Sequence, residues 1–169
     1  MNNYLKICVQ FVCLLTVQVF IGNRLNFLGF VNPQICILFI LWLPMVKKSL
    51  SSLGIAFCFG LALDVFSNSG GVNIAALLGI TFFRIPLLSS VLRNSELDLE
   101  IFDYSFLNTI QKFSFVFILS LIHQFVINIL EYYELAFLLK AFYKAFISSI
   151  FTTFVVLLLL SIFKPNYSS

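Results

Sequence analysis

The sequence predicts an all-α integral membrane protein: one domain, residues 1–169, with six transmembrane helices and both termini in the cytoplasm. Of the 169 residues 61% are hydrophobic and 10% are charged, whereas a soluble domain has about 25% charged residues. The apolar runs are continuous and do not alternate, which argues against a transmembrane β-barrel. A lipid bilayer is therefore the expected solvent of this chain.

Six apolar segments follow one another along the chain. They are Leu5–Ile21, Pro33–Val46, Leu50–Phe66, Val72–Leu92, Ile110–Leu130 and Leu135–Phe163. Because a helix needs about 20 residues to cross a bilayer, the fourth and fifth segments are comfortably long enough. No small-residue cleavage pattern follows the first segment, so we interpret it as a retained helix and not as a signal peptide.

The second segment is short for a span. Asn32 is a suitable N-cap and Pro33 a suitable first-turn residue, while Pro44 disturbs the far end. As a helix the segment reaches only about 21 Å, and Lys47 and Lys48 can extend to the membrane surface to help it cross. The alternative is a re-entrant pair made by the second and third segments.

The last segment is too long for one upright span. Lys140 and Lys144 interrupt its first half at helical spacing. This pattern indicates an amphipathic stretch, Tyr132–Lys144, lying on the membrane surface before a span that starts near Ala145. One long tilted helix is the alternative.

The orientation follows from the basic residues in the short loops. With the N-terminus inside, six basic residues lie on the inner side and three on the outer side, and Arg84, within the fourth segment, is expected to reach inward. The inner residues are Lys6, Lys47, Lys48, Arg93, Lys112 and Lys164; the outer ones are Arg24, Lys140 and Lys144.

Small residues recur every four positions in the third and fourth segments. The third carries Ser52, Ala56, Gly60, Asp64 and Asn68, and the fourth carries Gly71, Ala75 and Gly79. Such rows let two membrane helices approach closely. Because residues 67–71 form a very short connection, the two rows predict a tight antiparallel hairpin with Asp64 near its outer end.

Asp64 has two interpretations. A carboxylate at membrane depth costs roughly 2.5–3.5 kcal/mol at a helix centre, so it needs either partners or a function. The structural interpretation has it accept hydrogen bonds from Ser67, Ser69, Asn73 or the first amides of the fourth segment. The other is a proton or cation site, which is disfavoured because no other acid lies within a span.

His123 lies in the middle of the fifth segment, beside a polar strip of Ser120, Gln124 and Asn128. In lipid such groups usually hold helices together, and a histidine with no Cys, Asp or second His beside it makes a poor metal site. No nucleophile–base pair, phosphate-binding loop or zinc motif is present. We therefore expect no enzymatic activity, no cofactor and no metal.

Charge and cysteine content add little further chemistry. The net charge of +3 is too small to indicate nucleic acid as a partner. The cysteines all lie in apolar runs without a C-x-x-C pair, and we interpret them as small hydrophobic residues. They are Cys8, Cys13, Cys36 and Cys58.

The stretch Asn32–Pro86 resembles the rod shape-determining protein MreD family. The matching features are Asn32-Pro33 opening an apolar segment, a proline and basic residues ending it, the glycine-rich third segment with Leu-Asp64-Val-Phe-Ser, and Gly70-Gly71-Val before the fourth. Family members often carry His or Arg near the start of that fourth segment, where this chain has Asn73.

The resemblance implies a non-enzymatic scaffold subunit of the bacterial cell-elongation machinery, which makes peptidoglycan, in the inner (plasma) membrane. Its expected partner is MreC; MreB, RodA and the transpeptidase of RodA would be more distant partners. It also implies a fold like the substrate-binding components of energy-coupling vitamin transporters.

The alternative function is a small-molecule-binding component of a vitamin-type transporter. Its outer pocket, or equally a partner contact, would use Asn128, Glu131, Tyr132 and Glu134, with Tyr133 between them. The competing interpretation of these residues is a wet loop with an aromatic belt.

Overall fold

The computed structural model describes residues 3–24, 32–43, 50–92, 107–132 and 138–163. These residues form helices and no strand. The helices are α1 (Asn3–Phe20), the 3₁₀ turn η1 (Gly22–Arg24), α2 (Cys36–Trp42), α3 (Leu50–Ser67), α4 (Val72–Leu92), α5 (Thr109–Tyr132) and α6 (Leu138–Ile162). All of the α-helices except α2 are long and apolar enough to cross a membrane. The prediction of an all-α chain with several membrane-crossing helices is confirmed.

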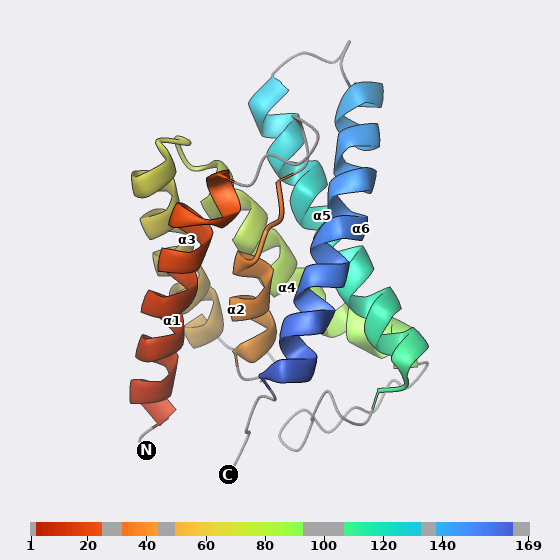
Figure 1. Cartoon of the computed structure of the whole chain (residues 1–169), viewed down its shortest axis with the longest axis horizontal. Helices are drawn as coiled ribbons and strands as arrows, with labels where there is room; N and C mark the ends of the chain where they lie inside the picture. The colour runs from red at the N-terminus through yellow and green to blue at the C-terminus, as the bar shows by residue number, and fades with distance from the viewer. Residues whose placement is uncertain (1–2, 25–31, 44–49, 93–106, 133–137, 164–169) are drawn as a thin grey trace.

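The helices pack mostly against their neighbours in the chain, in the order α3–α4–α5–α6, and α1 packs against α3. Figure 1 shows α2 in the middle of this bundle, and it contacts α1, α4 and α6. The start of α1 and the end of α6 lie at the same end of the bundle. The other helices therefore surround α2, and its residues Cys36–Leu41 are buried.

The second apolar segment is not a sixth transmembrane helix, and this prediction is corrected. Its helix begins at Cys36 and not at Pro33, and its seven residues span only about 10 Å. Residues 32–34 are non-helical. Figure 1 shows Asn32–Leu43 running in the direction opposite to α1 and α3. The segment therefore runs in the direction expected for a transmembrane helix that follows α1, but its helix is too short to span a membrane.

Burial explains why this short helix is stable. Every residue from Cys36 to Leu41 is at most 1% exposed. Phe39 stacks on Phe59 of α3 with ring centroids 4.2 Å apart, and Phe11 of α1 meets both rings edge-on. Aromatic pairs in these geometries gain about 0.5–1.5 kcal/mol each beyond their buried area. The core of the protein is therefore built around α2.

The described part of the last apolar segment forms one long helix, which agrees with the alternative interpretation of a single helix. α6 runs for 25 residues from Leu138, and Lys140 and Lys144 lie in its first two turns. Tyr132 is the last residue of α5. The predicted surface helix Tyr132–Lys144 is wrong, because its beginning and its end belong to two different helices.

Candidate functional site

The connection between α3 and α4 is organised around the carboxylate of Asp64, which is 6% exposed. Its Oδ1 accepts hydrogen bonds from Ser69 Oγ (2.5 Å), from the Asn73 backbone N (3.0 Å) and from Asn73 Nδ2 (3.0 Å). Its Oδ2 accepts one from the backbone N of Ile74 at 3.0 Å. The backbone amides belong to the first turn of α4, where a helix presents unpaired N–H groups and partial positive charge. The hydrogen bonds predicted for Asp64 are present, with Ser69 and Asn73 as two of the partners.

Ser67, the other partner considered for Asp64, is engaged elsewhere. Its Oγ accepts a hydrogen bond from Asn23 Nδ2 at 2.8 Å, which ties the turn after α1 to the end of α3. The chain then turns through Asn68, Gly70 and Gly71, all with positive φ (51°, 62° and 97°). Glycine adopts this conformation at little cost, and asparagine tolerates it better than most residues. The connection is short because these residues allow it.

The close approach predicted between the third and fourth segments occurs at Gly60. A Cβ atom there would lie 2.8 Å from Ile74 Cα and 3.1 Å from Ile74 N. Ala56, one turn earlier, is fully buried. Gly60 and Asp64 therefore fix the same residue of α4, one by leaving room for its backbone and the other by binding its amide.

The small residues of α4 lie on the other side of the helix. Ala75 is exposed, and among the described residues no heavy atom lies within 4 Å of a Cβ placed at Gly71 or Gly79. The prediction that this row packs into the hairpin is corrected: the row faces outward. The hydrogen bonds from the backbone amides of Asn73 and Ile74 to Asp64 determine how α4 is rotated about its own axis, and in this rotation the row points away from α3.

Side chains from three helices hold the non-helical stretch before α2. Gln18 Oε1 of α1 accepts from the backbone N of Cys36 at 3.1 Å, and Gln18 Nε2 lies 3.4 Å from Pro33 O. Gln124 Nε2 of α5 donates to Asn32 O at 3.0 Å. From α6, Thr152 Oγ1 accepts from the backbone N of Gln34 at 3.3 Å. Non-helical backbone at membrane depth requires such partners, since lipid offers none.

Arg84 binds the opposite end of α2. It is 1% exposed, and its Nη1 donates to Ile40 O at 2.7 Å and to Leu43 O at 3.0 Å. The last carbonyls of a helix carry partial negative charge and lack partners within the helix. Arg84 therefore lies within the bundle and caps the end of α2.

His123 has a cysteine beside it, which corrects the expectation of an isolated histidine. Its Nε2 lies 3.8 Å from Cys36 Sγ, and both residues are fully buried. Cys36 Sγ also lies 3.5 Å from Gln34 Oε1. Among the described residues no group of three or more His, Cys, Asp or Glu side chains could hold a metal ion.

Of the residues predicted for an outer pocket, the structure describes the side chains of Asn128 and Glu131. Asn128 is 1% exposed and faces the core, where its Nδ2 donates to Gln124 O at 2.7 Å. Glu131 is exposed and lies 3.9 Å from Lys144 Nζ. The Tyr132 side chain, Tyr133 and Glu134 lie outside the described residues. Asn128 and Glu131 thus belong to different environments.

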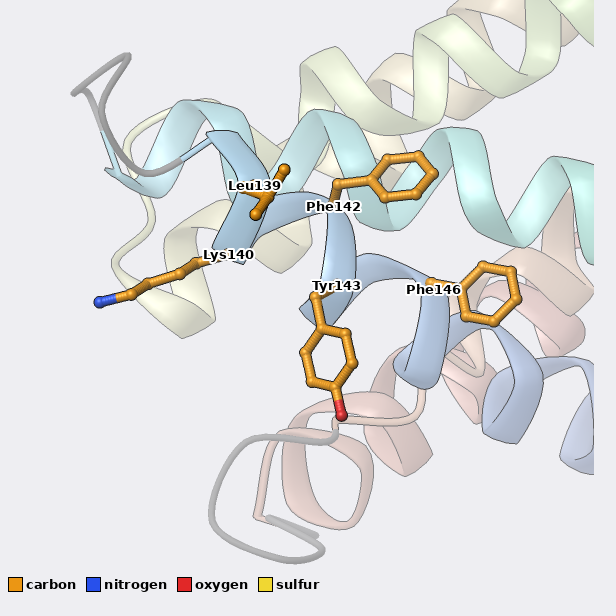
Figure 2. Close-up of a pocket in the computed structure, with 5 residues that line it drawn as sticks. All are labelled: Leu139, Lys140, Phe142, Tyr143 and Phe146. Atoms are coloured by element: carbon orange, nitrogen blue, oxygen red, sulfur yellow. The ribbon is translucent and has the colours of Figure 1, made fainter.

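A shallow groove lies on the outside of α6, near its first residues. Figure 2 shows Phe142 and Phe146 extending to the same side while Lys140 extends the opposite way; Leu139 and Tyr143 complete the lining. Phe142, Tyr143 and Phe146 are all at least 43% exposed. This exposed apolar surface is what a lipid-facing helix presents.

The sequence did not indicate that the side chains of Gln18, Thr152 and Arg84 bind the backbone before and at the end of α2. Only Arg84 carried a clear signal, because a charged residue within a span is by default a functional candidate. Gln18 and Thr152 act on backbone that the sequence suggested was helical, so their partners could not be anticipated.

The fold and its buried polar contacts define a multi-pass α-helical membrane protein with a discontinuous central segment. Comparison with family models, with curated proteins and with solved structures finds no match.

Proposed function

We propose that this protein is a non-enzymatic membrane scaffold subunit of the bacterial cell-elongation complex, acting in the plasma membrane. Its partner would be a single-span protein of the MreC type. The observation that carries the proposal is the outward-facing row made by Ala75 and Gly79 on α4 and by Gly71, which directly precedes this helix. In lipid, helices associate through close packing, and small residues at this spacing let a second helix approach the backbone.

The contacts between α3 and α4 support a role of this row in packing against a partner helix. Asp64 binds the first turn of α4, and Gly60 lets the α3 backbone touch it. The outer face of α4 is therefore fixed before any partner arrives, which lowers the entropic cost of binding. Phe82 and Phe83, at 67% and 50% exposure, continue the same side of α4 beyond Gly79 and offer apolar contact area.

The choice of partner comes from the resemblance of Asn32–Pro86 to the MreD family. It makes MreC the direct partner, with the MreB filament, RodA and its transpeptidase further away. No catalytic role is assigned to Cys36 and His123, both of which are fully buried.

Co-purification tests the proposal. Affinity-tagged protein co-expressed with MreC in bacterial membranes should retain MreC through detergent extraction, and Ala75→Leu should lose it because the larger side chain blocks close approach. Cys13→Leu, also a small-to-large change on an exposed position of α1, is the matched control and should retain MreC. Equal capture by wild type and Ala75→Leu would contradict the proposal.

A further inference from the structure

The centre of the bundle is more polar than a scaffold of lipid-embedded helices requires. Around the stretch before α2, polar side chains of α1, α5 and α6 are at most 3% exposed. They are Gln18, Ser120, His123, Gln124, Asn128 and Thr152. Buried polar groups at membrane depth are costly and mark functional sites. Discontinuous helices with non-helical backbone are where transporters build such sites.

Three of these side chains, and that of Asn32, each carry an atom with no hydrogen-bond partner among the described residues. These atoms are Asn32 Oδ1, Ser120 Oγ, His123 Nδ1 and Asn128 Oδ1. Ser120 and His123 are fully buried, and Asn128 is 1% exposed. Since buried polar groups in native proteins are nearly always bonded to protein or to ordered water, these atoms require a partner.

Three of the unpartnered atoms belong to residues within about one helical turn of Gln124, and the fourth belongs to Asn32, whose carbonyl Gln124 binds. Ser120 and Asn128 are one helical turn before and after Gln124, on the same face of α5. His123 adjoins this face and reaches Cys36, four residues after Asn32. They therefore line a single region between α5 and the chain entering α2.

The chemistry of these atoms defines what they bind. The oxygens of Asn32 and Asn128 only accept hydrogen bonds, while the serine hydroxyl and the imidazole either accept or donate. The groups named here are amides, hydroxyls, an imidazole and a thiol, with no carboxylate, ammonium or guanidinium among them. A fitting ligand is small, has no charge and offers O–H or N–H donors.

We propose that this region is a binding site for a small neutral hydrogen-bond donor, either ordered water or an organic solute with hydroxyl or amide groups. The site does not depend on partner binding by α4. If MreC is not captured, the proposed binding site is unaffected. If no ligand is found in this site, the proposed scaffold function is unaffected.

Hydroxyl-radical footprinting by a brief X-ray pulse tests for water, because radicals form from water beside the residue that they modify. Each rate is divided by the rate of the same residue in denatured protein. His123 should be modified several-fold faster than Phe115, which is equally buried on the same helix. Asn128→Leu should lower the His123 rate toward that of Phe115. Ser120→Ala is the milder second variant if Asn128→Leu does not fold.

Native mass spectrometry of the same protein from membranes tests for an organic solute. A bound mass present in wild type and absent in Ser120→Ala or Asn128→Leu identifies a solute; radical modification without such a mass identifies water. Both outcomes support the site. Equal protection of His123 and Phe115, together with no bound mass, would overturn it.

Discussion

The carboxylate of Asp64 binds the backbone amide of Ile74 at 3.0 Å, although ten residues and a reversal of chain direction separate the two. Gly60, one turn before Asp64, leaves the space that Ile74 Cα needs. This pairing sets the rotation of α4 about its own axis. As a result the row of Gly71, Ala75 and Gly79 faces outward, where another helix can reach it.

Gly60→Ala should destabilise the protein by about 1–3 kcal/mol, because the new methyl group meets backbone atoms that cannot move independently. A lower unfolding temperature in detergent would be the measurement. Gly54→Ala on the same helix is the control: a Cβ there has no heavy atom of the described residues within 4 Å, and alanine favours helix over glycine by about 1 kcal/mol. Equal melting of both variants would refute the close contact.

Asp64→Asn should lower stability and weaken partner capture, because Asp64 fixes the first turn of α4. The amide has one acceptor oxygen where the carboxylate has two, so at least one of the four donors around Asp64 loses its partner, a cost of about 1–3 kcal/mol. Thermal unfolding and MreC co-purification measure the two effects. If Asp64→Asn folds and melts as wild type yet fails in cells, the proton-site hypothesis gains over the structural role.

Arg84→Met should destabilise the bundle by several kcal/mol, since hydrogen bonds from a charged donor contribute about 1.5–3 kcal/mol each and Ile40 O and Leu43 O would lose theirs. Proteolysis of the detergent-solubilised protein should become faster. Lys112→Met, at a half-exposed position in the first turn of α5, removes the same charge and should leave the rate unchanged. An unchanged rate in Arg84→Met would show that α2 needs no cap.

Gln18→Leu should loosen the stretch before α2, because the Cys36 amide and the Pro33 carbonyl lose their side-chain partner. Amide hydrogen exchange at the start of α2 should speed up by at least the tenfold that about 1.4 kcal/mol represents. Gln10→Leu, two turns earlier on α1, is the control and should leave this exchange slow. Slow exchange in both variants would contradict the account of Gln18.

Local patterns predicted much of this structure. The bounds of α4 agree with the apolar run Val72–Leu92, and the turn residues around Gly70 placed Asp64 beside the first amides of α4. These features depend on residues close together in the chain. Side-chain hydrogen bonds at such short separations can be anticipated from spacing alone.

Contacts between distant segments were not predictable in this way. Asn32 and Pro33 have the signature of a helix start, yet the chain stays non-helical because Gln18, Gln124 and Thr152 supply its partners. The outward-facing position of Ala75 depends likewise on a tertiary contact, the hydrogen bond from the Ile74 backbone N to Asp64. Tertiary contacts override helix propensity where they provide hydrogen-bond partners for the backbone in a non-helical conformation.

Disulfide cross-linking in native membranes tests whether the outward-facing row beside and on α4 contacts the partner helix. In protein whose own cysteines are replaced by serine or alanine, Ala75→Cys and Gly79→Cys are each paired with single cysteines along the transmembrane helix of co-expressed MreC. Leu158→Cys, on the exposed side of α6, is the control. We predict cross-links from positions 75 and 79, periodic along the partner helix, and none from position 158. Cross-links from position 158 alone, or from no position, would contradict the account.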